Sequence, residues 1–157
     1  MPVFVEPVAS DSALPARADV VVIGGGIIGA ATAFFLAERG VSVALCEKGA
    51  IGAEQSSRNW GWCRTMGRDV REIPLAIESL RLWRELNARI GAETGFRQAG
   101  IVYTCDTESD MAEQEAWLEQ ARQWQVDARL LTGDAAADLL PGVARRFAGV
   151  LHTPSDG

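Results

Sequence analysis

The sequence has few of the residues that build disulfide frameworks or zinc sites. Its 157 residues include three cysteines, Cys46, Cys63 and Cys105, which are widely spaced and form no CxxC pair. An odd and scattered set of this kind argues against a disulfide framework and against a zinc centre. Reduced thiols are typical of cytoplasmic proteins, so the sequence predicts a cytoplasmic location and no metal site.

Long apolar segments and clustered basic charge are also missing. No apolar run approaches the roughly 20 residues that a membrane-spanning helix requires. The formal net charge is −6, whereas a general nucleic-acid surface or an anionic-membrane surface would need clustered basic residues. Residues 1–18 lack the basic and long apolar regions of a secretory signal, and we expect them to form a short flexible leader. The length favours a soluble protein of about one domain.

From residue 19 onward, the pattern predicts a strand, a helix and a second strand. Residues 19–26 (DVVVIGGG) form a continuous apolar run that ends in glycines, which is typical of a strand buried on both faces of a parallel sheet. Residues 27–40 are predicted to form a helix that ends at Gly40, and residues 41–48 a second buried strand. Together they make one βαβ unit, whose crossover should be right-handed.

The rest of the chain is predicted to mix loops, helices and strands. Residues 49–74 contain glycines and polar residues, and we expect an ordered loop with a short helix. Further helices are predicted at 75–90, 108–125 and 132–140, and further strands at 96–105, 126–131 and 148–154. The predicted fold class is α/β, with a Rossmann-like unit at 19–75 and part of an α+β domain at 76–157. Its sheet is expected to be incomplete, because doubly wound sheets normally have several more parallel strands.

Three glycines between the first strand and the first helix follow the dinucleotide-binding spacing GxGxxG. Gly24 permits a tight turn, Gly26 lets the backbone approach a pyrophosphate, and Gly29 lets the helix and the strand pack closely. Ile27 and Ile28 begin the helix, where N–H groups and the positive end of the helix dipole face the phosphates. A glycine-rich turn that packs a helix without binding a ligand is the alternative.

Glu47 ends the second predicted strand, 23 residues after Gly24. An acidic residue about 20 residues beyond the first glycine accepts hydrogen bonds from ribose hydroxyls. Because a carboxylate there repels a 2′-phosphate, FAD or NAD is favoured over NADP. Lys48 follows directly and is included in the candidate cofactor site. With the strand, the helix and Glu47 in register, the sequence predicts a site for an adenine dinucleotide.

Residues 54–64 (EQSSRNWGWCR) make this pattern more specific. Together with residues 19–49 and with the later stretches GIVYTCDTE, LLPGV and GVLHTPSDG, this segment resembles the FAD-dependent amine and amino-acid oxidoreductases. Glycine oxidase, sarcosine oxidase and D-amino-acid dehydrogenases belong to that group, and the resemblance covers about residues 19–157. It implies FAD as cofactor and oxidation of the C–N bond of an amino acid or secondary amine by hydride transfer to flavin. An NAD-linked dehydrogenase and a non-enzymatic dinucleotide-fold module are the alternatives.

In that family, the loop after the second strand runs beside the pyrophosphate and the flavin ring. The resemblance therefore implies further cofactor contacts, at Ser56, Ser57, Arg58, Asn59, Gly61 and Trp62. The two serines would offer hydroxyls or N–H groups, and the arginine and asparagine would brace the loop or neutralise phosphate charge. The glycine and the tryptophan would pass close to the isoalloxazine.

Arg64 falls where some family members place an arginine near the substrate carboxylate, which a guanidinium binds in a bidentate manner. A structural ion pair with the acidic surface is the alternative. Trp60 and Trp62 would share one face of a strand, and would then simply be core residues. Cys63 is disfavoured as a covalent flavin attachment, because members attached through this loop are expected to use a histidine. The one histidine, His152, is expected to be structural, and no catalytic residue is predicted.

The expected partners are a small amine or amino acid, with no nucleic acid and no membrane span. Because the sheet is predicted to be incomplete, we also expect the missing strands to come from an absent C-terminal half or from a complementing chain. The 157 residues would then be a fragment or one piece of a split protein. Exposed apolar sheet edges would invite association, and the chain alone would be inactive.

Overall fold

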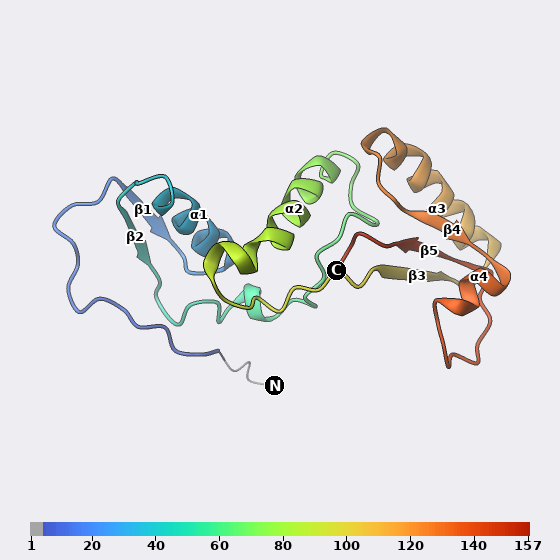
Figure 1. The fold of residues 1–157 in the computed structure, drawn as a ribbon, viewed down its shortest axis with the longest axis horizontal. Helices are drawn as coiled ribbons and strands as arrows, with labels where there is room; N and C mark the ends of the chain where they lie inside the picture. Colours follow the sequence, from blue (N-terminus) through green and yellow to red (C-terminus); the bar gives the residue numbers. More distant parts are fainter. Residues whose placement is uncertain (1–4) are drawn as a thin grey trace. The chain divides into compact units, whose positions relative to one another are not determined.

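The computed structural model describes residues 5–157 and separates into two compact units, Met1–Gly61 and Trp62–Gly157 (Figure 1). Residues 5–18 of the predicted leader contain no helix or strand, and residues 1–4 lie outside the described residues. The division after Gly61 precedes the domain boundary that the sequence pattern placed after residue 75. Cys63 and Thr65 hydrogen-bond to residues at the end of the chain, which makes them part of the second unit.

The first unit has the strand–helix–strand order that the glycine-rich segment predicts. It contains β1 (Val20–Ile23), α1 (Ile27–Ala37), β2 (Val43–Cys46) and the short 3-10 helix η1 (Gln55–Ser57). β1 and β2 pair in parallel, with Val20 opposite Val43. α1 ends three residues before Gly40, whose φ of 77° suits the turn that leads into β2.

The prediction that β1 is buried on both faces is wrong for this unit. Val21 is 58% exposed and Ile23 is 88% exposed. Successive residues of a strand point to opposite faces, and this sheet consists of two strands with the single helix α1 beside them. The apolar run therefore forms a strand as predicted, but one set of its side chains is left uncovered.

The second unit contains all six of the remaining predicted helices and strands and, in addition, one 3-10 helix. In chain order these are α2 (Ile73–Ile90), β3 (Ile101–Cys105), α3 (Glu108–Ala121), the 3-10 helix η2 (Arg122–Trp124), β4 (Arg129–Leu131), α4 (Gly133–Asp138) and β5 (Gly149–Thr153). α2 begins earlier than predicted, because Pro74 lies in its first turn, where a missing N–H costs nothing. The strands form an antiparallel sheet in the order β3-β5-β4, with Tyr103 opposite Leu151.

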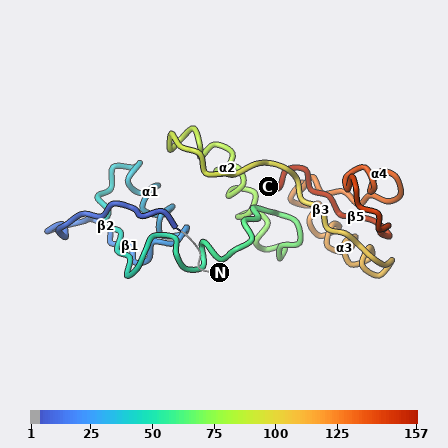
Figure 2. Tube along the Cα trace, turned by 90° about the horizontal axis from the view of Figure 1, so that it is seen from below, coloured from blue at the N-terminus to red at the C-terminus, as the bar shows by residue number. Residues whose placement is uncertain are grey.

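The core of the second unit forms where α3 packs on this sheet, and both views show the helix beside the sheet (Figures 1 and 2). Thr107 starts the helix with a capping box: its hydroxyl accepts from the Asp110 N–H, and the Asp110 carboxylate accepts from the Thr107 N–H. The buried cluster joins Ile101, Leu118 and Leu151 with Met66, which lies in a loop. This loop is thus fixed to the core by a side chain.

Among residues 5–157, no helix combines the length and the apolar character that crossing a membrane would require. The same residues contain no group of three or more His, Cys, Asp or Glu side chains placed to hold a metal ion.

Candidate functional site

In the glycine turn between β1 and α1, the backbone at Gly29 lies very close to the backbone at Gly24. Gly24 has a φ of 104°, and its N–H donates to the carbonyl oxygen of Cys46 at 2.8 Å. A Cβ at position 29 would lie 1.8 Å from the Gly24 carbonyl oxygen. Any side chain at Gly29 would push the helix off the strand. The turn that brings the start of α1 to the end of β1 therefore requires glycine at this position.

The N-terminus of α1 is met by a hydroxyl group from the loop after β2. Gly26 is the N-cap residue and has no side chain to cap the helix. The Ile27 N–H donates instead to Ser56 Oγ at 2.8 Å, and a Cβ at Gly26 would lie 3.0 Å from the same oxygen. The Ile28 side chain is exposed beside them. Three of the predicted cofactor residues thus meet at a helix start, where an anionic group is stabilised by N–H donors and by the helix dipole.

The Glu47 carboxylate is held by the glycine turn. Its Oε2 accepts from the Gly25 N–H at 2.7 Å, and its Oε1 accepts from the Gly49 N–H at 2.8 Å. These bonds, the one from Gly25 foremost, hold the pKa of Glu47 below its ordinary value, and the charge of exposed Lys48 adds to them. Each carboxylate oxygen keeps further acceptor capacity. The group is therefore charged and oriented at neutral pH, and can still accept hydrogen bonds from ribose hydroxyls.

Two contacts at the glycine turn were not predicted from the sequence. The Ile51 side chain folds over Gly25, since a Cβ on that glycine would lie 2.3 Å from Ile51 Cδ1. The Gly52 N–H donates to the Gly25 carbonyl oxygen at 2.9 Å. No motif or charge marks these positions. The extra glycine at position 25 is the one local signal that something packs on the turn.

The loop that follows is braced by its own polar residues. Ser57 Oγ donates to the Glu54 carbonyl oxygen at 3.2 Å, and Arg58 forms an ion pair with the Glu54 carboxylate at 3.3 Å. Asn59 donates from its amide to a main-chain carbonyl and accepts from the Gly61 N–H at 2.6 Å. Bracing was one of the two roles expected for Arg58 and Asn59. Cofactor contacts by this loop stay a prediction.

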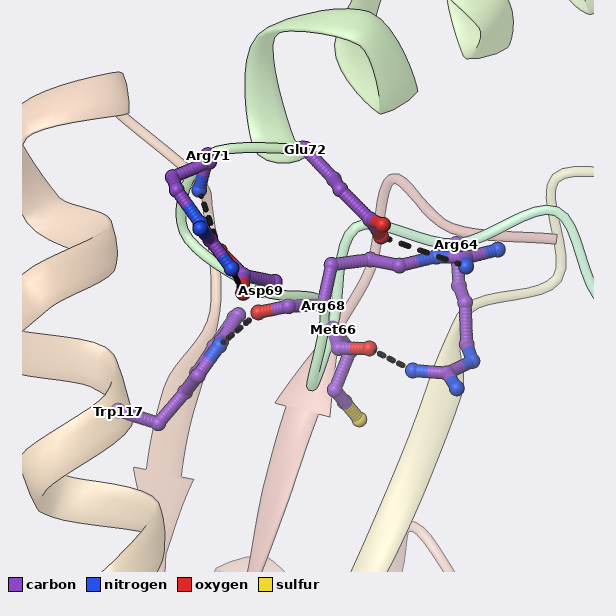
Figure 3. Close-up of polar contacts among 7 residues, drawn as sticks. All are labelled: Arg64, Met66, Arg68, Asp69, Arg71, Glu72 and Trp117. Atoms are coloured by element: carbon purple, nitrogen blue, oxygen red, sulfur yellow. Dashed lines mark hydrogen bonds and ion pairs between the residues drawn. The ribbon is translucent and has the colours of Figure 1, made fainter.

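In the second unit, Arg64 lies beside two aromatic rings. Its Cζ is 6.0 Å from the centroid of the Trp62 ring and 5.6 Å from that of Tyr103, distances at which a cation is attracted to an aromatic face. Its guanidinium also donates to the Met66 carbonyl oxygen (Figure 3). Among the described residues, Arg64 has no carboxylate partner within ion-pair distance, so the structural ion pair considered as an alternative is not found.

The tryptophans of the polar stretch are not core residues. Trp60 is 83% exposed and Trp62 is 48% exposed, and neither lies on a strand. Cys63 is half-buried, and this burial, together with the nearby charge of Asp156, raises the pKa of its thiol. A thiol that stays protonated is a poor nucleophile, which agrees with the argument against a covalent attachment there.

The segment after Met66 is held locally. The indole N–H of Trp117, on α3, donates to the Arg68 carbonyl oxygen at 2.8 Å, and the Arg68 side chain reaches Glu72 at 3.8 Å. Asp69 and Arg71 pair through two side-chain hydrogen bonds (Figure 3). Arg68 and Arg71 therefore each pair with an acidic side chain of this segment. Arg64 does not, which makes it the candidate here for binding the carboxylate of a substrate.

A family model described as FAD dependent oxidoreductase matches residues 19–157. The chain belongs to this FAD-dependent oxidoreductase family. The glycine oxidase of Geobacillus kaustophilus is 32% identical over 149 residues, which are 90% of this chain and 40% of that protein. The sarcosine oxidase subunit beta of an Arthrobacter species is 31% identical, over 78% of this chain and 31% of its own length.

Solved structures agree with this family. The L-amino acid deaminase of Proteus myxofaciens, in complex with anthranilate, matches 98% of this chain with a TM-score of 0.89 and 32% identity. The match covers 35% of that protein. The chain therefore spans about a third to two fifths of the length of these FAD-dependent relatives.

FAD is the cofactor of this family, which decides between the two dinucleotides that the glycine motif left open. The residues present fit an adenine dinucleotide. Gly26 leaves room for a pyrophosphate at the start of α1, beside Ser56 Oγ, and the Glu47 carboxylate is oriented for a ribose. Contact of FAD with each candidate residue stays a prediction.

The lowered pKa of Glu47 predicts a pH-dependent effect of Glu47→Gln. A pKa that is lower in the folded state means that the ionised carboxylate stabilises the fold at pH values above 4.5, the ordinary pKa of the group. This contribution is lost as the pH falls through the folded-state pKa. Thermal denaturation of both proteins from roughly pH 3 to 7 should show the wild type more stable at neutral pH, with the gap closing in acid. An equal gap at every pH would contradict the assigned role of the Gly25 and Gly49 hydrogen bonds.

Proposed function

We propose that this chain provides the FAD-binding part, and one substrate-binding residue, of an enzyme that oxidises the C–N bond of an amino acid or secondary amine. The observation that carries the proposal is the convergence of Gly26, Ser56 and Glu47 on the start of α1. The names of the relatives support the substrate class, since glycine, sarcosine and L-amino acids all carry an amino nitrogen next to a carboxylate.

At the cofactor end, we assign three tasks to residues of the first unit. The start of α1 binds the pyrophosphate, because Gly26 has no side chain and the helix dipole favours negative charge. Ser56 Oγ, which accepts from the Ile27 N–H, has a hydroxyl hydrogen to donate to a phosphate oxygen. Glu47 accepts from the ribose hydroxyls while the Gly25 and Gly49 N–H groups hold it.

At the substrate end, we assign the substrate carboxylate to Arg64. Its guanidinium contacts aromatic rings and one carbonyl oxygen rather than an acidic side chain. The planar guanidinium therefore keeps donors for a bidentate carboxylate. An arginine so placed orients the substrate and leaves its amino nitrogen free to react.

The reaction needs little acid or base chemistry from this chain. FAD supplies the hydride acceptor when it is bound. The substrate enters with a neutral amine, its C–H bond next to nitrogen breaks, and the electron pair leaves with the hydrogen. Loss of the N–H proton to water gives an imine, which a second water molecule hydrolyses to a carbonyl compound and an amine or ammonia. The residues of this chain bind and orient, and none is assigned as an acid or base.

We also propose that turnover requires the part of the fold that these residues do not include. The exposed Val21 and Ile23 side chains of β1 form an apolar strand face that a fuller sheet and its helices would cover. The limited share of each relative that the chain spans supports the same idea. The covering residues would come from a continuation of this chain or from a second polypeptide, and the isolated chain would be inactive.

Neighbouring serines provide a matched test of the cofactor site. Ser56→Ala should weaken FAD binding about tenfold, because it removes the hydroxyl at the start of α1. Ser57 is also a predicted cofactor contact, but its hydroxyl donates to the Glu54 carbonyl oxygen within its own loop, so Ser57→Ala should weaken FAD binding much less than Ser56→Ala. FAD dissociation constants measured by flavin fluorescence check both. Equal effects of the two substitutions would refute the assignment of Ser56.

Substitution of Arg64 tests the substrate assignment. Arg64→Ala in the active FAD-loaded enzyme should raise the KM for an amino-acid substrate about tenfold or more, because a charge-assisted bidentate interaction is lost. FAD affinity should stay the same. Arg71→Ala is the control, since Arg71 is an exposed arginine nearby whose guanidinium pairs with Asp69. A KM that Arg64→Ala leaves unchanged would return Arg64 to a structural role.

A further inference from the structure

Asp156 is a buried carboxylate whose side-chain hydrogen bonds go to the segment that carries Arg64. It is 0% exposed. Its Oδ1 accepts from the Thr65 N–H at 2.8 Å and from the Thr65 hydroxyl at 2.9 Å, and its Oδ2 accepts from the Met66 N–H at 3.0 Å. The two residues that directly follow Arg64 are therefore bound to one side chain from the far end of the sequence.

The residue that directly precedes Arg64 is bound to the neighbour of Asp156. The Cys63 N–H donates to the Gly157 carbonyl oxygen at 2.6 Å, and the Gly157 N–H donates back to the Cys63 carbonyl oxygen at 2.9 Å. A Cβ at Gly157 would lie 2.2 Å from the Arg97 carbonyl oxygen. Glycine is thus required at this place, and both sides of Arg64 are held by the same two residues.

The pair formed by Asp156 and Gly157 is itself fixed to the sheet. The Asp156 N–H donates to the Thr153 carbonyl oxygen at the end of β5, at 3.3 Å. The Asp156 carbonyl oxygen accepts from the Gly100 N–H at 2.9 Å, next to the start of β3. Through Asp156 and Gly157, the loop around Arg64 is therefore attached to two adjacent strands of the second unit, β3 and β5.

The chemistry of these contacts selects a carboxylate. Three donors converge on two oxygens, and among the described residues no basic side chain lies within ion-pair distance of Asp156. A carboxylate can accept at both ends, whereas an asparagine amide would turn its NH₂ toward one of the N–H donors. Burying a carboxylate without a cation is costly. That cost is offset only if the donors are held in place, which here means that the loop backbone is held in place.

We infer that Asp156 is a positioning residue for substrate binding: by fixing Thr65 and Met66 it sets the direction in which the Arg64 side chain leaves the loop. The inference rests on the proposed role of Arg64 as the carboxylate-binding residue. Among residues 5–157, no hydrogen bond or ion pair joins the side chains of Arg64 and Asp156. Arg64 lies instead against Trp62 and Tyr103, with its guanidinium on the Met66 carbonyl oxygen. A shift of Met66 therefore shifts the guanidinium that binds the substrate.

The test compares Asp156→Asn with the control Asp69→Asn in the FAD-loaded enzyme. Asp69 is a carboxylate of the same segment, and its side-chain hydrogen bonds go to Arg71 rather than to Thr65 or Met66. Hydrogen exchange of the Thr65 and Met66 amides reports the loop, and anthranilate, detected by the change in flavin absorbance, probes the carboxylate site. Thr65→Val is a milder second variant, because it removes the hydroxyl donor and keeps the N–H group.

Asp156→Asn should speed exchange of these two amides about tenfold and weaken anthranilate binding about tenfold, while FAD affinity stays unchanged. Thr65→Val should act in the same direction with a smaller effect, and Asp69→Asn should do neither. In an Arg64→Ala background, Asp156→Asn should weaken anthranilate binding by less than about twofold further, because two residues that act through one contact are not additive.

Three results would overturn the inference, and they differ in whether the role of Arg64 also falls. If Arg64→Ala weakens anthranilate binding but Asp156→Asn does not, or does so additively, the role of Arg64 stands and the positioning role of Asp156 is wrong. If hydrogen exchange of the Thr65 and Met66 amides is unchanged in Asp156→Asn, the positioning role of Asp156 is also wrong. If Arg64→Ala leaves anthranilate binding unchanged, the carboxylate site itself is wrong, and the inference falls with it.

Discussion

A side chain at position 29 would collide with the carbonyl oxygen of Gly24, at 1.8 Å, and the cofactor half of the structure depends on this close contact. It brings the start of α1 to the end of β1, where the Gly25 N–H faces the Glu47 carboxylate. The loop after β2 can then fold back far enough for Ser56 Oγ to meet the Ile27 N–H. The acidic residue and the serine acquire their orientation from a backbone approach that only glycine allows.

In both units, a side chain from a distant part of the sequence satisfies backbone N–H groups. No strand or helix satisfies these groups, and the polar side chain that meets them is Ser56 for the start of α1 and Asp156 for the loop around Arg64. Unsatisfied N–H groups are costly once they are buried. The bonds from Asp156 remove this cost for the buried Thr65 and Met66 N–H groups, whereas Ser56 gives a partner to the exposed Ile27 N–H. Each set of contacts also fixes a segment that we propose binds the cofactor or the substrate.

Much of the fold could be predicted from local signals. Apolar runs, helical periodicity and glycines indicated every α-helix and strand described above, and the glycine spacing with Glu47 indicated a dinucleotide site. Three features were beyond such reasoning. The exposure of Val21 and Ile23 depends on what covers the sheet. The contact of Ile51 with Gly25 has no sequence pattern. Asp156 stood in the TPSDG stretch that supported the family resemblance, but its bonds to Thr65 and Met66 join distant positions.

The start of α1 is the proposed FAD site, and Gly26→Val would place a side chain in it. A side chain at position 26 would enter the space beside Ser56 Oγ, 3.0 Å from a Cβ, where the pyrophosphate is proposed to lie. The flavin absorbance of the purified protein, relative to its protein content, should show about one FAD per wild-type chain and almost none in the variant. A wild type without flavin, or a Gly26→Val variant that is properly folded and retains as much FAD as the wild type, would show that the start of α1 is not the FAD site.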